Sequence, residues 1–427
     1  MRLGTSVVTI TPQVPVPMGG YGARTGPAVG VHDPLTARAL VLEDGGVRTG
    51  FVVADLLMLN HEQAEAARQG AASLTGIDPD HLVVATTHTH SGPSTLANPL
   101  LGGAFDAAYM AWVIPALAGA IYQAARELEE VLPGWAAGEV AGVGSGRRAA
   151  PADPDPQPLT VLSFFRPDGS LRAALVLFQC HPTLMGADNL LISADLAGAG
   201  RDAAQALLGQ DVFVVLANGA CGDVSTRFTR RSQTFQELRR LGAMLGAAAA
   251  GLALRAEPQR LAKGALRVGA VTVDLPMRQL PPVEVAQAQL EQMQQAWERA
   301  QANPAISAGD LRLARTAMEG AQVQAFLATS QGQGERRAEL TGWRLGDAGL
   351  VTIPGEMFAS LGERIRAGSG LAATLVIGYS GGHVGYIPDR EGFQSGGYEA
   401  LSSPLSPAAG DLLAEAAAGL LRRLASD

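Results

Sequence analysis

The feature that most constrains the fold of this chain is a unit that recurs along it. An apolar, β-branched run is followed by a loop rich in Gly, Pro and Ser, and then by a helical pattern. Such alternation is typical of α/β proteins, in which strands and helices form separate layers. The runs that read as strands are residues 49–54, 82–87, 173–179, 212–217, 350–353 and 373–378. We therefore predict an α/β fold of mixed β-sheets flanked by helices.

Polar side chains follow these runs closely. They are, in chain order, Asp55, His88 and His90, His181, Asp223 and Ser225, Glu356, and Tyr386. In open α/β sheets ligands bind beyond the carboxyl ends of the strands. The order of these residues thus predicts one shared active site at the C-terminal ends of the strands. The alternative is that these side chains are polar only because surface loops generally are.

One segment departs from the alternation. From Pro281 the apolar residues step by three and four, and a second stripe of the same kind follows Asn303 and ends before the polar residues 331–334. Each stripe is typical of an amphipathic helix. We predict a single domain over residues 1–427 with a helical hairpin inserted at 281–338. We expect the hairpin to pack against the body or a second subunit and to shape substrate access, with a surface decoration docked on its own domain as the alternative.

Composition and charge narrow the classes of function. Hydrophobic residues make up 47% of the chain and charged residues 17%, which favours a compact globular protein. A net charge of −8 and few aromatic residues argue against a nucleic-acid partner. The only lysine, Lys263, lies outside any phosphate-binding loop, which excludes Walker-A chemistry and disfavours a lysine Schiff base. Two cysteines cannot form a cysteine-rich zinc cluster or a disulfide scaffold.

The sequence also carries expectations about location. No signal peptide is visible at the N-terminus, so we expect a cytoplasmic protein. The uncharged run at residues 241–254 is too short to cross a bilayer and reads as a buried helix, so we expect no membrane span.

The strongest local signal is the run Thr-His-Thr-His-Ser-Gly-Pro at residues 87–93. On extended backbone, side chains at i and i+2 face the same side, so His88 and His90 would point into one pocket as a metal half-site requires. His181 follows a buried run and could equally be structural. Glu356 precedes a helical stretch, whose positive end favours an ionised carboxylate. Alternatively, Glu356 is not a metal ligand and only places a negative charge at the N-terminal end of that helix.

Several fragments together resemble the catalytic domain of the neutral/alkaline ceramidases, zinc-dependent amidases of N-acyl sphingosines. The fragments occur in order along most of the chain. They are Pro-Met-Gly-Gly-Tyr-Gly at 17–22, Val-His-Asp-Pro at 31–34 with Ala-Arg-Ala at 37–39, the loop at 87–93, His-Pro-Thr at 181–183, Ser-Ala-Asp at 193–195, residues 218–225, Pro-Gly-Glu at 354–356, residues 385–388 and residues 397–400.

The resemblance implies one Zn²⁺ per chain, held by His88, His181, Glu356 and Tyr386, with His90 beside the metal. Two imidazoles and one carboxylate are also a set that zinc hydrolysis uses. The phenol of Tyr386 has a physical alternative, because a neutral Tyr can instead donate a hydrogen bond to a developing oxyanion.

The resemblance further implies catalytic roles for His90, Ser225 and Arg147. Thr226 stands where a proline is expected after Ser225, and Arg148 is a rival to Arg147. Whether Ser225 or a metal-activated water is the nucleophile stays open at this point. His32, Asp55 and Asp195 either orient the ligand imidazoles or are structural.

We therefore expect a zinc amidohydrolase that cleaves an N-acyl amide in a small, lipid-like substrate, ceramide or another compound. A zinc esterase or phosphoesterase on the same scaffold, and a non-enzymatic lipid- or metabolite-binding protein, are the alternatives. The ceramidases carry a further C-terminal β-sandwich domain, which we do not expect here. A homo-oligomer is left open.

Overall fold

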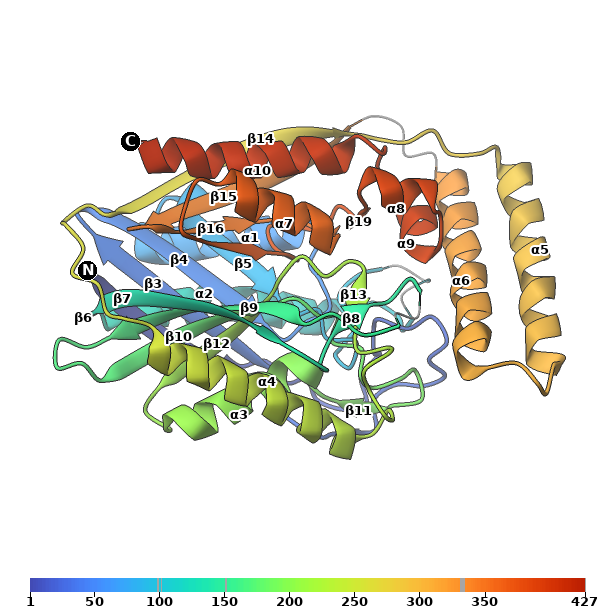
Figure 1. Ribbon diagram of the computed structural model, residues 1–427, viewed down its shortest axis with the longest axis horizontal. Coiled ribbons are helices and arrows are strands. Elements are labelled where there is room, and N and C mark those ends of the chain that lie inside the picture. Colours follow the sequence, from blue (N-terminus) through green and yellow to red (C-terminus); the bar gives the residue numbers. More distant parts are fainter. Residues whose placement is uncertain (98–99, 101, 150–151, 331–334, 427) are drawn as a thin grey trace.

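The body of the chain consists of three β-sheets, each covered on its outer face by a pair of helices (Figure 1). It is known from a computed structural model, which describes residues 1–97, 100, 102–149, 152–330 and 335–426. The mixed sheets and flanking helices confirm the predicted fold class.

The first sheet has the strand order β5-β4-β3-β1-β6 and is covered by helices α1 and α2. The strands are β1 (Arg2–Thr9), β3 (Thr36–Asp44), β4 (Val47–Ala54), β5 (Leu82–Thr86) and β6 (Glu129–Glu130), and the helices are α1 (His61–Thr75) and α2 (Ala107–Arg126). Helix α1 begins at a complete capping box, in which Asn60 and Gln63 satisfy each other's backbone amides.

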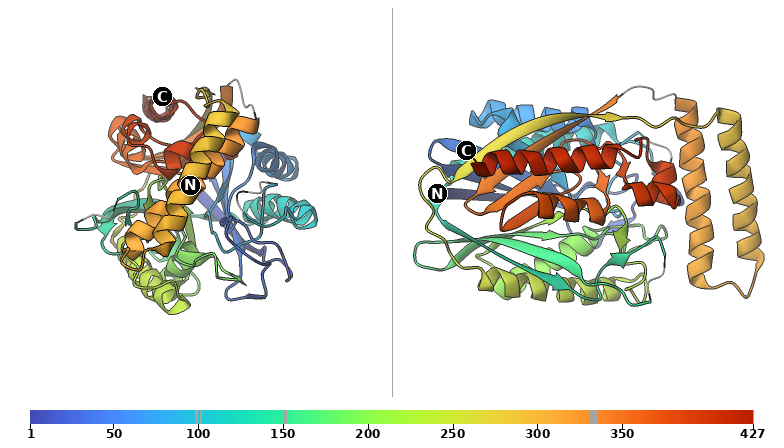
Figure 2. Two further views of the ribbon diagram at one scale, coloured as in Figure 1. Left: turned by 90° about the vertical axis from the view of Figure 1, so that its right-hand side faces the viewer. Right: turned by 45° about the horizontal axis from the view of Figure 1, so that its top comes forward.

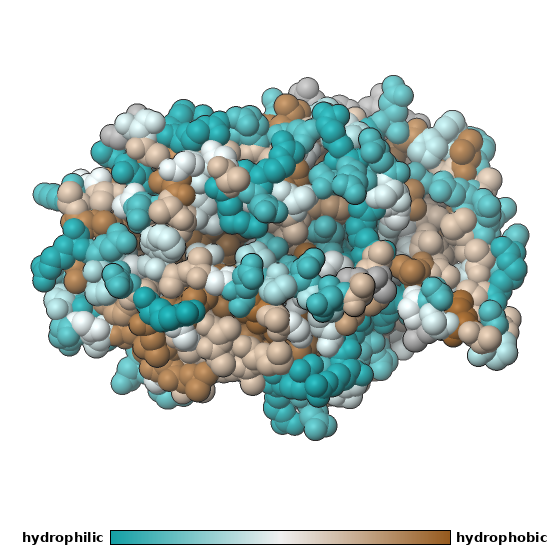
Figure 3. Space-filling model, viewed as in Figure 1, coloured by the Kyte–Doolittle hydropathy of each residue, from teal (hydrophilic) through white to brown (hydrophobic). Residues whose placement is uncertain are grey.

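The second sheet has the order β12-β10-β9-β7 and is covered by helices α3 and α4. Its elements are β7 (Leu132–Val140), β9 (Gln157–Phe165), β10 (Leu171–Phe178), β12 (Phe213–Asn218), α3 (Asp195–Leu208) and α4 (Phe235–Arg255). Figure 3 shows an apolar area at the lower left of the face drawn, over this helical layer.

The third sheet has the order β14-β15-β16-β18 and is covered by helices α7 and α10. Its elements are β14 (Leu266–Pro276), β15 (Glu335–Leu345), β16 (Ala348–Thr352), β18 (Ala373–Ile377), α7 (Ala359–Gly368) and α10 (Ala409–Ser426). Short strands link the loops at one end of the body: β2 (Gly30–Val31) pairs with β11 (Leu191–Ile192), β8 (Ser145–Gly146) with β13 (Val224–Ser225), and β17 (Glu356–Met357) with β19 (Tyr386–Ile387).

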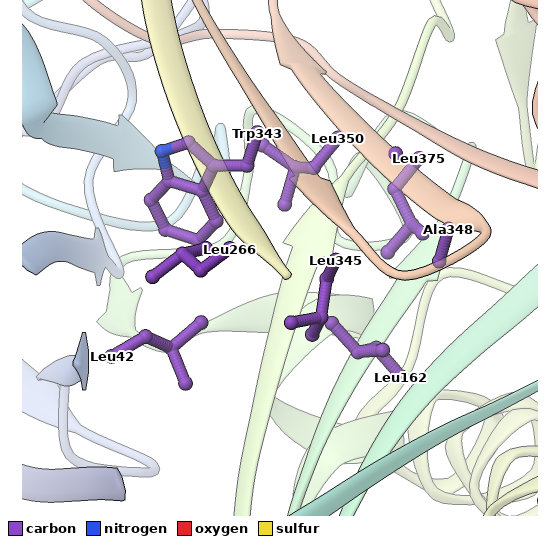
Figure 4. Close-up of a pocket in the computed structure, with 9 residues that line it drawn as sticks. Leu42, Leu162, Leu266, Trp343, Leu345, Ala348, Leu350 and Leu375 are labelled. Atoms are coloured by element: carbon purple, nitrogen blue, oxygen red, sulfur yellow. The ribbon is translucent and has the colours of Figure 1, made fainter. Parts of the chain in front are cut away.

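The inner faces of the three sheets meet in one central core. Alternate residues of each inner strand point into it, as Phe51, Leu175 and Leu375 do, while their neighbours Val52 and Val176 pack under the helices. Burial on both faces explains why the inner strands read as continuous apolar runs in the sequence. A void of about 10 Å³ lies among the leucines around Trp343 (Figure 4), and it is too small for a ligand.

Each sheet contains one parallel pair of strands: β4 with β5, β10 with β12, and β16 with β18. These six strands are the six runs predicted from the sequence, with ends that differ by a few residues. Because the loops after them gather at one end of the body, the pairs determine where the site forms.

A pair of antiparallel helices, α5 (Val283–Ala302) and α6 (Ala308–Ser330), stands at that same end, beyond the sheets (Figure 2). Helix α6 packs on the short helix α9 (Tyr398–Ser402), and α5 packs on α6 through alanines. Of the predicted segment 281–338, residues 331–334 lie outside the described chain. The residues from Glu335 onward belong to β15.

Helix α2 corrects one statement from the sequence. It is long and apolar enough to cross a membrane by length and composition alone, whereas from the sequence we considered residues 241–254 for this purpose. In the structure α2 packs on β1, β3 and α1, with Leu117 and Ile121 fully buried. This packing buries 44% of the apolar window, and Trp112 of the same helix is 49% exposed.

Candidate metal centre

The residues that follow the parallel strands converge at the end of the body next to the hairpin. His88 and His90 come from the loop after β5, His181 from the loop after β10, and Glu356 from β17 after β16. The ring nitrogens that His88, His90 and His181 offer all lie within 4.8 Å of one another. The structure thus brings together residues that are far apart in the sequence.

The backbone at His88 differs from the extended conformation that the i, i+2 argument assumed. Strand β5 ends at Thr86, and His88 has a φ of 66°, in the left-handed region. Its backbone amide donates to Leu56 O and its Nδ1 lies 2.8 Å from Leu57 O, so tertiary contacts hold this conformation. The rings of His88 and His90 still meet, with their Nε2 atoms 3.2 Å apart.

The carboxylate of Glu356 lies between two of these imidazoles. Its Oε2 is 2.9 Å from Nε2 of His181 and 3.4 Å from Nε2 of His88. All three side chains are at most 5% exposed. His383 approaches the other oxygen, with Nε2 3.2 Å from Oε1.

The tautomers of these imidazoles follow from their backbone partners. Nδ1 faces a backbone carbonyl oxygen in each ring: Leu57 O for His88, Gly20 O for His90 and Cys221 O for His181. A carbonyl oxygen can only accept, so each Nδ1 carries the hydrogen and a neutral ring is left with a lone pair on Nε2.

Burial keeps at least two of the rings neutral. It lowers the pKa of His181 to about 3, with Arg147 acting in the same direction, and it lowers the pKa of His90 well below its ordinary value. The Nε2 of His181 therefore faces a carboxylate oxygen with no hydrogen of its own to share. A cation can accept lone pairs from all of these atoms at once, which removes the repulsion between facing acceptors. Two imidazoles with a carboxylate fit Zn²⁺.

The ionised state of Glu356 has a different cause from the one expected. Burial alone would raise its pKa, but the neighbouring imidazoles, His88 foremost, hold it well below its usual range. The helix that follows begins only at Ala359, and its first amide donates to Oδ1 of Asp223. The ionised carboxylate predicted from the sequence is therefore maintained by these imidazoles, while Asp223 binds the first amide of the helix.

Arg147 and Tyr386 form a second polar group beside the imidazoles. Nη2 of Arg147 donates to the phenol oxygen of Tyr386 at 2.9 Å, and its Nε donates to Glu399 at 2.8 Å. Burial, opposed by the nearby Arg147, raises the pKa of Tyr386 well above its ordinary value, so the phenol is protonated in this arrangement. Arg148 turns away to Gly392 O and the hydroxyl of Ser395.

Ser225 is buried in strand β13, which bridges to His181. Its hydroxyl accepts from the backbone amide of Arg227 at 3.2 Å. Among the described residues, no imidazole donates to or accepts from this hydroxyl.

The residues that could have oriented the ligand imidazoles contact other groups. Asp55 accepts from Thr36 and Arg201, and Asp195 accepts from the amides of the loop after His181. His32 contacts Asp33 and stacks on Phe235. The structural alternative therefore holds for all three of them, since backbone carbonyls orient the imidazoles.

Four residues near the site were missed as functional candidates. Tyr379 stacks on His88 with ring centroids 4.2 Å apart, and His383 contacts Glu356. Tyr398 packs against Tyr386 at 5.6 Å, and Glu399 pairs with Arg147. Their positions in the sequence could have indicated them. All four follow strand β18, and Tyr398 and Glu399 lie in a fragment already quoted for the resemblance.

Two glycines allow the loops of the site to approach one another. A Cβ at Gly222 would lie 2.3 Å from Glu356 O, and one at Gly20 would lie 2.7 Å from the ring of His90. Gly20 also has a φ of 98°, which a side chain would strain. These positions require glycine for close packing around the metal-ligating candidates.

A cavity of about 1040 Å³ opens from this centre toward the hairpin. His90, Arg147, Ser225 and Tyr386 line its inner end. Helix α6 and Trp297 of α5 line the outer side. The cavity is large enough for a small amphiphilic molecule.

Comparisons with known proteins agree with these observations. A sequence model of the family described as neutral/alkaline non-lysosomal ceramidase, N-terminal, matches residues 1–230. The neutral ceramidase of Pseudomonas aeruginosa is 28% identical over 219 residues, which is 46% of this chain and 32% of that protein. The match therefore spans about a third of the length of that relative.

Two solved structures share the fold. One, a ceramidase complexed with C2, has a TM-score of 0.76 at 19% identity and covers 100% of this chain and 75% of its own. The other, the neutral ceramidase from Pseudomonas aeruginosa, has a TM-score of 0.75 at 21% identity, over 99% of this chain and 74% of its own. With the family match over more than half of its residues, the chain belongs to the neutral/alkaline non-lysosomal ceramidase family.

Proposed function

We propose that this protein is a zinc-dependent hydrolase that cleaves the amide bond of an N-acyl compound. The observation that carries the proposal is the meeting of two imidazoles on one buried carboxylate, His88 and His181 on Glu356, next to a cavity of about 1040 Å³. The family and the relative described above are ceramidases, which supports an amide as the substrate.

In this proposal one Zn²⁺ is held by His88, His181 and Glu356. Tyr386, which the resemblance implies as a fourth ligand, acts instead through its protonated phenol. The three-histidine cluster offers His90 as a rival ligand. We favour Glu356 over His90, because the carboxylate contacts both other ligands and brings a negative charge to the cation. When bound, zinc acts as a Lewis acid on a carbonyl and lowers the pKa of a coordinated water to about 7.

The chain's own residues then have separate tasks. His90 is kept neutral by burial, and its Nε2 lone pair can accept a proton from the attacking water and pass it to the leaving amine. Arg147 and the protonated phenol of Tyr386 offer N–H and O–H donors to the oxygen of the amide carbonyl as charge develops on it. Ser225 orients substrate or water, because its hydroxyl has no described imidazole to remove its proton.

The proposal is tested by turnover of a matched panel by zinc-loaded protein: a long-chain N-acyl amide, the ester of the same acid, and a phosphomonoester. We expect the amide to be cleaved with the highest kcat/KM. Faster cleavage of the ester or the phosphomonoester would replace the amidase assignment by the corresponding alternative. Stoichiometric binding without cleavage of any of the three would favour a binding protein.

A further inference from the structure

The wall of the cavity carries an excess of positive charge. The arginines that line it are Arg147, Arg227, Arg230, Arg312 and Arg315, and the carboxylates that line it are Asp188 and Glu319. Two of the arginines have carboxylate partners, since Arg147 pairs with Glu399 and Arg315 with Glu319, both within 2.9 Å. Among the described residues, Arg227, Arg230 and Arg312 have no such carboxylate partner.

Arg227, Arg230 and Arg312 contact only neutral acceptors among the described residues. Nη1 of Arg227 donates to Arg147 O at 2.8 Å, and Nη1 of Arg230 donates to Thr183 O at 2.7 Å. Nη2 of Arg312 lies 3.3 Å from the side-chain oxygen of Gln233. None of the three has a carboxylate within 4.0 Å in the described chain, whereas neighbouring guanidiniums do have one.

These three cations also lie within one another's field. Burial, with Arg147 and Arg312 acting in the same direction, lowers the pKa of Arg227 to about 10. Burial and then Arg312 lower the pKa of Arg230, against weaker opposite effects of Tyr21 and Asp195. An anion bound among these guanidiniums would relieve their mutual repulsion.

The inserted hairpin contributes both to this charge and to an apolar surface. Arg312 comes from α6, and the same helix lines the cavity with Leu311, Met318 and Val323, next to Trp297 of α5. Figure 2 shows the hairpin across one end of the body, and residues of both its helices line the cavity. The cavity therefore offers a cationic wall and an apolar wall side by side.

We propose that Arg227, Arg230 and Arg312 bind an anionic group of the substrate, while the apolar side of the hairpin holds its hydrocarbon chain. The substrate class is then an acidic N-acyl amide, such as one whose amine part carries a carboxylate or a phosphate. This inference rests on the proposed amide hydrolysis and specifies its substrate. Three guanidiniums suit a carboxylate or a phosphate equally, and the test distinguishes the two.

The test compares three amides with the same acyl chain: N-dodecanoylglycine, N-dodecanoylphosphoethanolamine and the neutral N-dodecanoylethanolamine. We expect zinc-loaded protein to cleave at least one acidic amide with a kcat/KM at least about 10-fold above the neutral one. Arg312→Gln should lower kcat/KM for that acidic amide by about 10- to 100-fold, as expected for a lost charge-assisted hydrogen bond. Arg312→Gln should change kcat/KM for the neutral amide by less than about 3-fold. For the acidic amide, kcat/KM of Arg312→Lys should lie between the values of the wild type and Arg312→Gln.

Arg299→Gln is the matched control. Arg299 is exposed on α5 of the same hairpin and does not line the cavity, so the control removes the same charge elsewhere. Arg227→Gln is a second variant, at a cavity arginine outside the hairpin, and thermal melting of each variant shows that it is folded. Equal cleavage of neutral and acidic amides, with no selective loss in either cavity variant, overturns the inference and leaves amide hydrolysis standing.

A binding measurement separates the inference from the proposed function. Titration calorimetry with decanoate and decyl phosphate needs no turnover. At least about 10-fold weaker binding of the preferred anion to Arg312→Gln than to Arg299→Gln would support the anion site even if no amide were cleaved. Equal affinities of these two variants for both anions would refute it.

Discussion

The buried pair of Arg147 and Glu399 allows the arrangement around Tyr386 to be tested by a single change of charge. Nε of Arg147 lies 2.8 Å from Oε1 of Glu399, and the two side chains are 7% and 5% exposed. Glu399→Gln keeps the shape of the side chain but removes the carboxylate. The buried guanidinium then loses the charge that compensates its transfer from water.

The expected cost follows from these values. Removal of one partner of a buried ion pair destabilises a protein by about 3–5 kcal/mol, and we take about 3 kcal/mol because Gln still accepts a hydrogen bond. An unfolding entropy of about 2.1 cal/mol/K per residue gives about 0.9 kcal/mol/K for 427 residues. The melting temperature should therefore fall by about 3 °C.

Scanning calorimetry measures this shift, with Glu415→Gln as the control. Glu415 pairs with Arg422 at the surface, where the side chains are 73% and 47% exposed, and such pairs contribute little. We also expect Glu399→Gln to lower kcat/KM by about 10-fold, because Arg147 would no longer be held against Tyr386. A Glu399→Gln protein that melts within about 1 °C of the wild type and retains full activity would refute this reasoning.

Three further predictions follow from particular contacts. Hydrogen bonds from Arg240, with burial opposing, lower the pKa of Glu237 to about 2 from 4.5, so the stability that the ionised carboxylate contributes is present above pH 4.5 and lost as the pH falls toward 2. The difference in melting temperature between wild type and Glu237→Gln should therefore be smaller at pH 3.5 than at pH 7. An equal difference at both pH values would contradict this. Mass spectrometry with a slowly cleaved amide should find no acyl group on Ser225, and a trapped acyl-serine would show covalent catalysis instead. Pro276 and Glu335 face each other in the paired strands β14 and β15, so a Gly-Ser bridge can replace residues 281–333. We expect this deletion to leave the bound zinc unchanged and to abolish the preference for acidic over neutral acyl amides. Loss of zinc, or an unchanged preference, would contradict the conclusion that the hairpin acts only on the cavity.

The sequence predicts the parallel strands well for a physical reason. Residues of β4, β10 and β18 are buried on both faces, so each strand is a continuous apolar run that stands out from its surroundings. The antiparallel strands β7 and β14 consist mostly of half-buried and exposed residues, which leaves a weaker signal, and we did not predict them from the sequence.

The candidate site could be predicted only in part. Local patterns single out His88 and His181, but the left-handed backbone at His88 depends on contacts with residues 56–57. Arg147, which faces the site, is bound by Glu399, and that residue lies 252 positions away along the chain. Contacts of this range leave no trace in the spacing of residues, and neither does the contact of His383 with Glu356.

The zinc content of the purified protein tests the central claim most directly. Elemental analysis of wild type and of His181→Ala, each exposed to Zn²⁺ and then dialysed, measures the metal retained per chain. We predict one Zn²⁺ per wild-type chain and a loss of at least about 90% in the variant, with the melting temperature of the variant showing that the fold is kept. Wild-type protein that retains no zinc, or a variant that retains as much as the wild type, would contradict the assignment of His88, His181 and Glu356 as a metal centre.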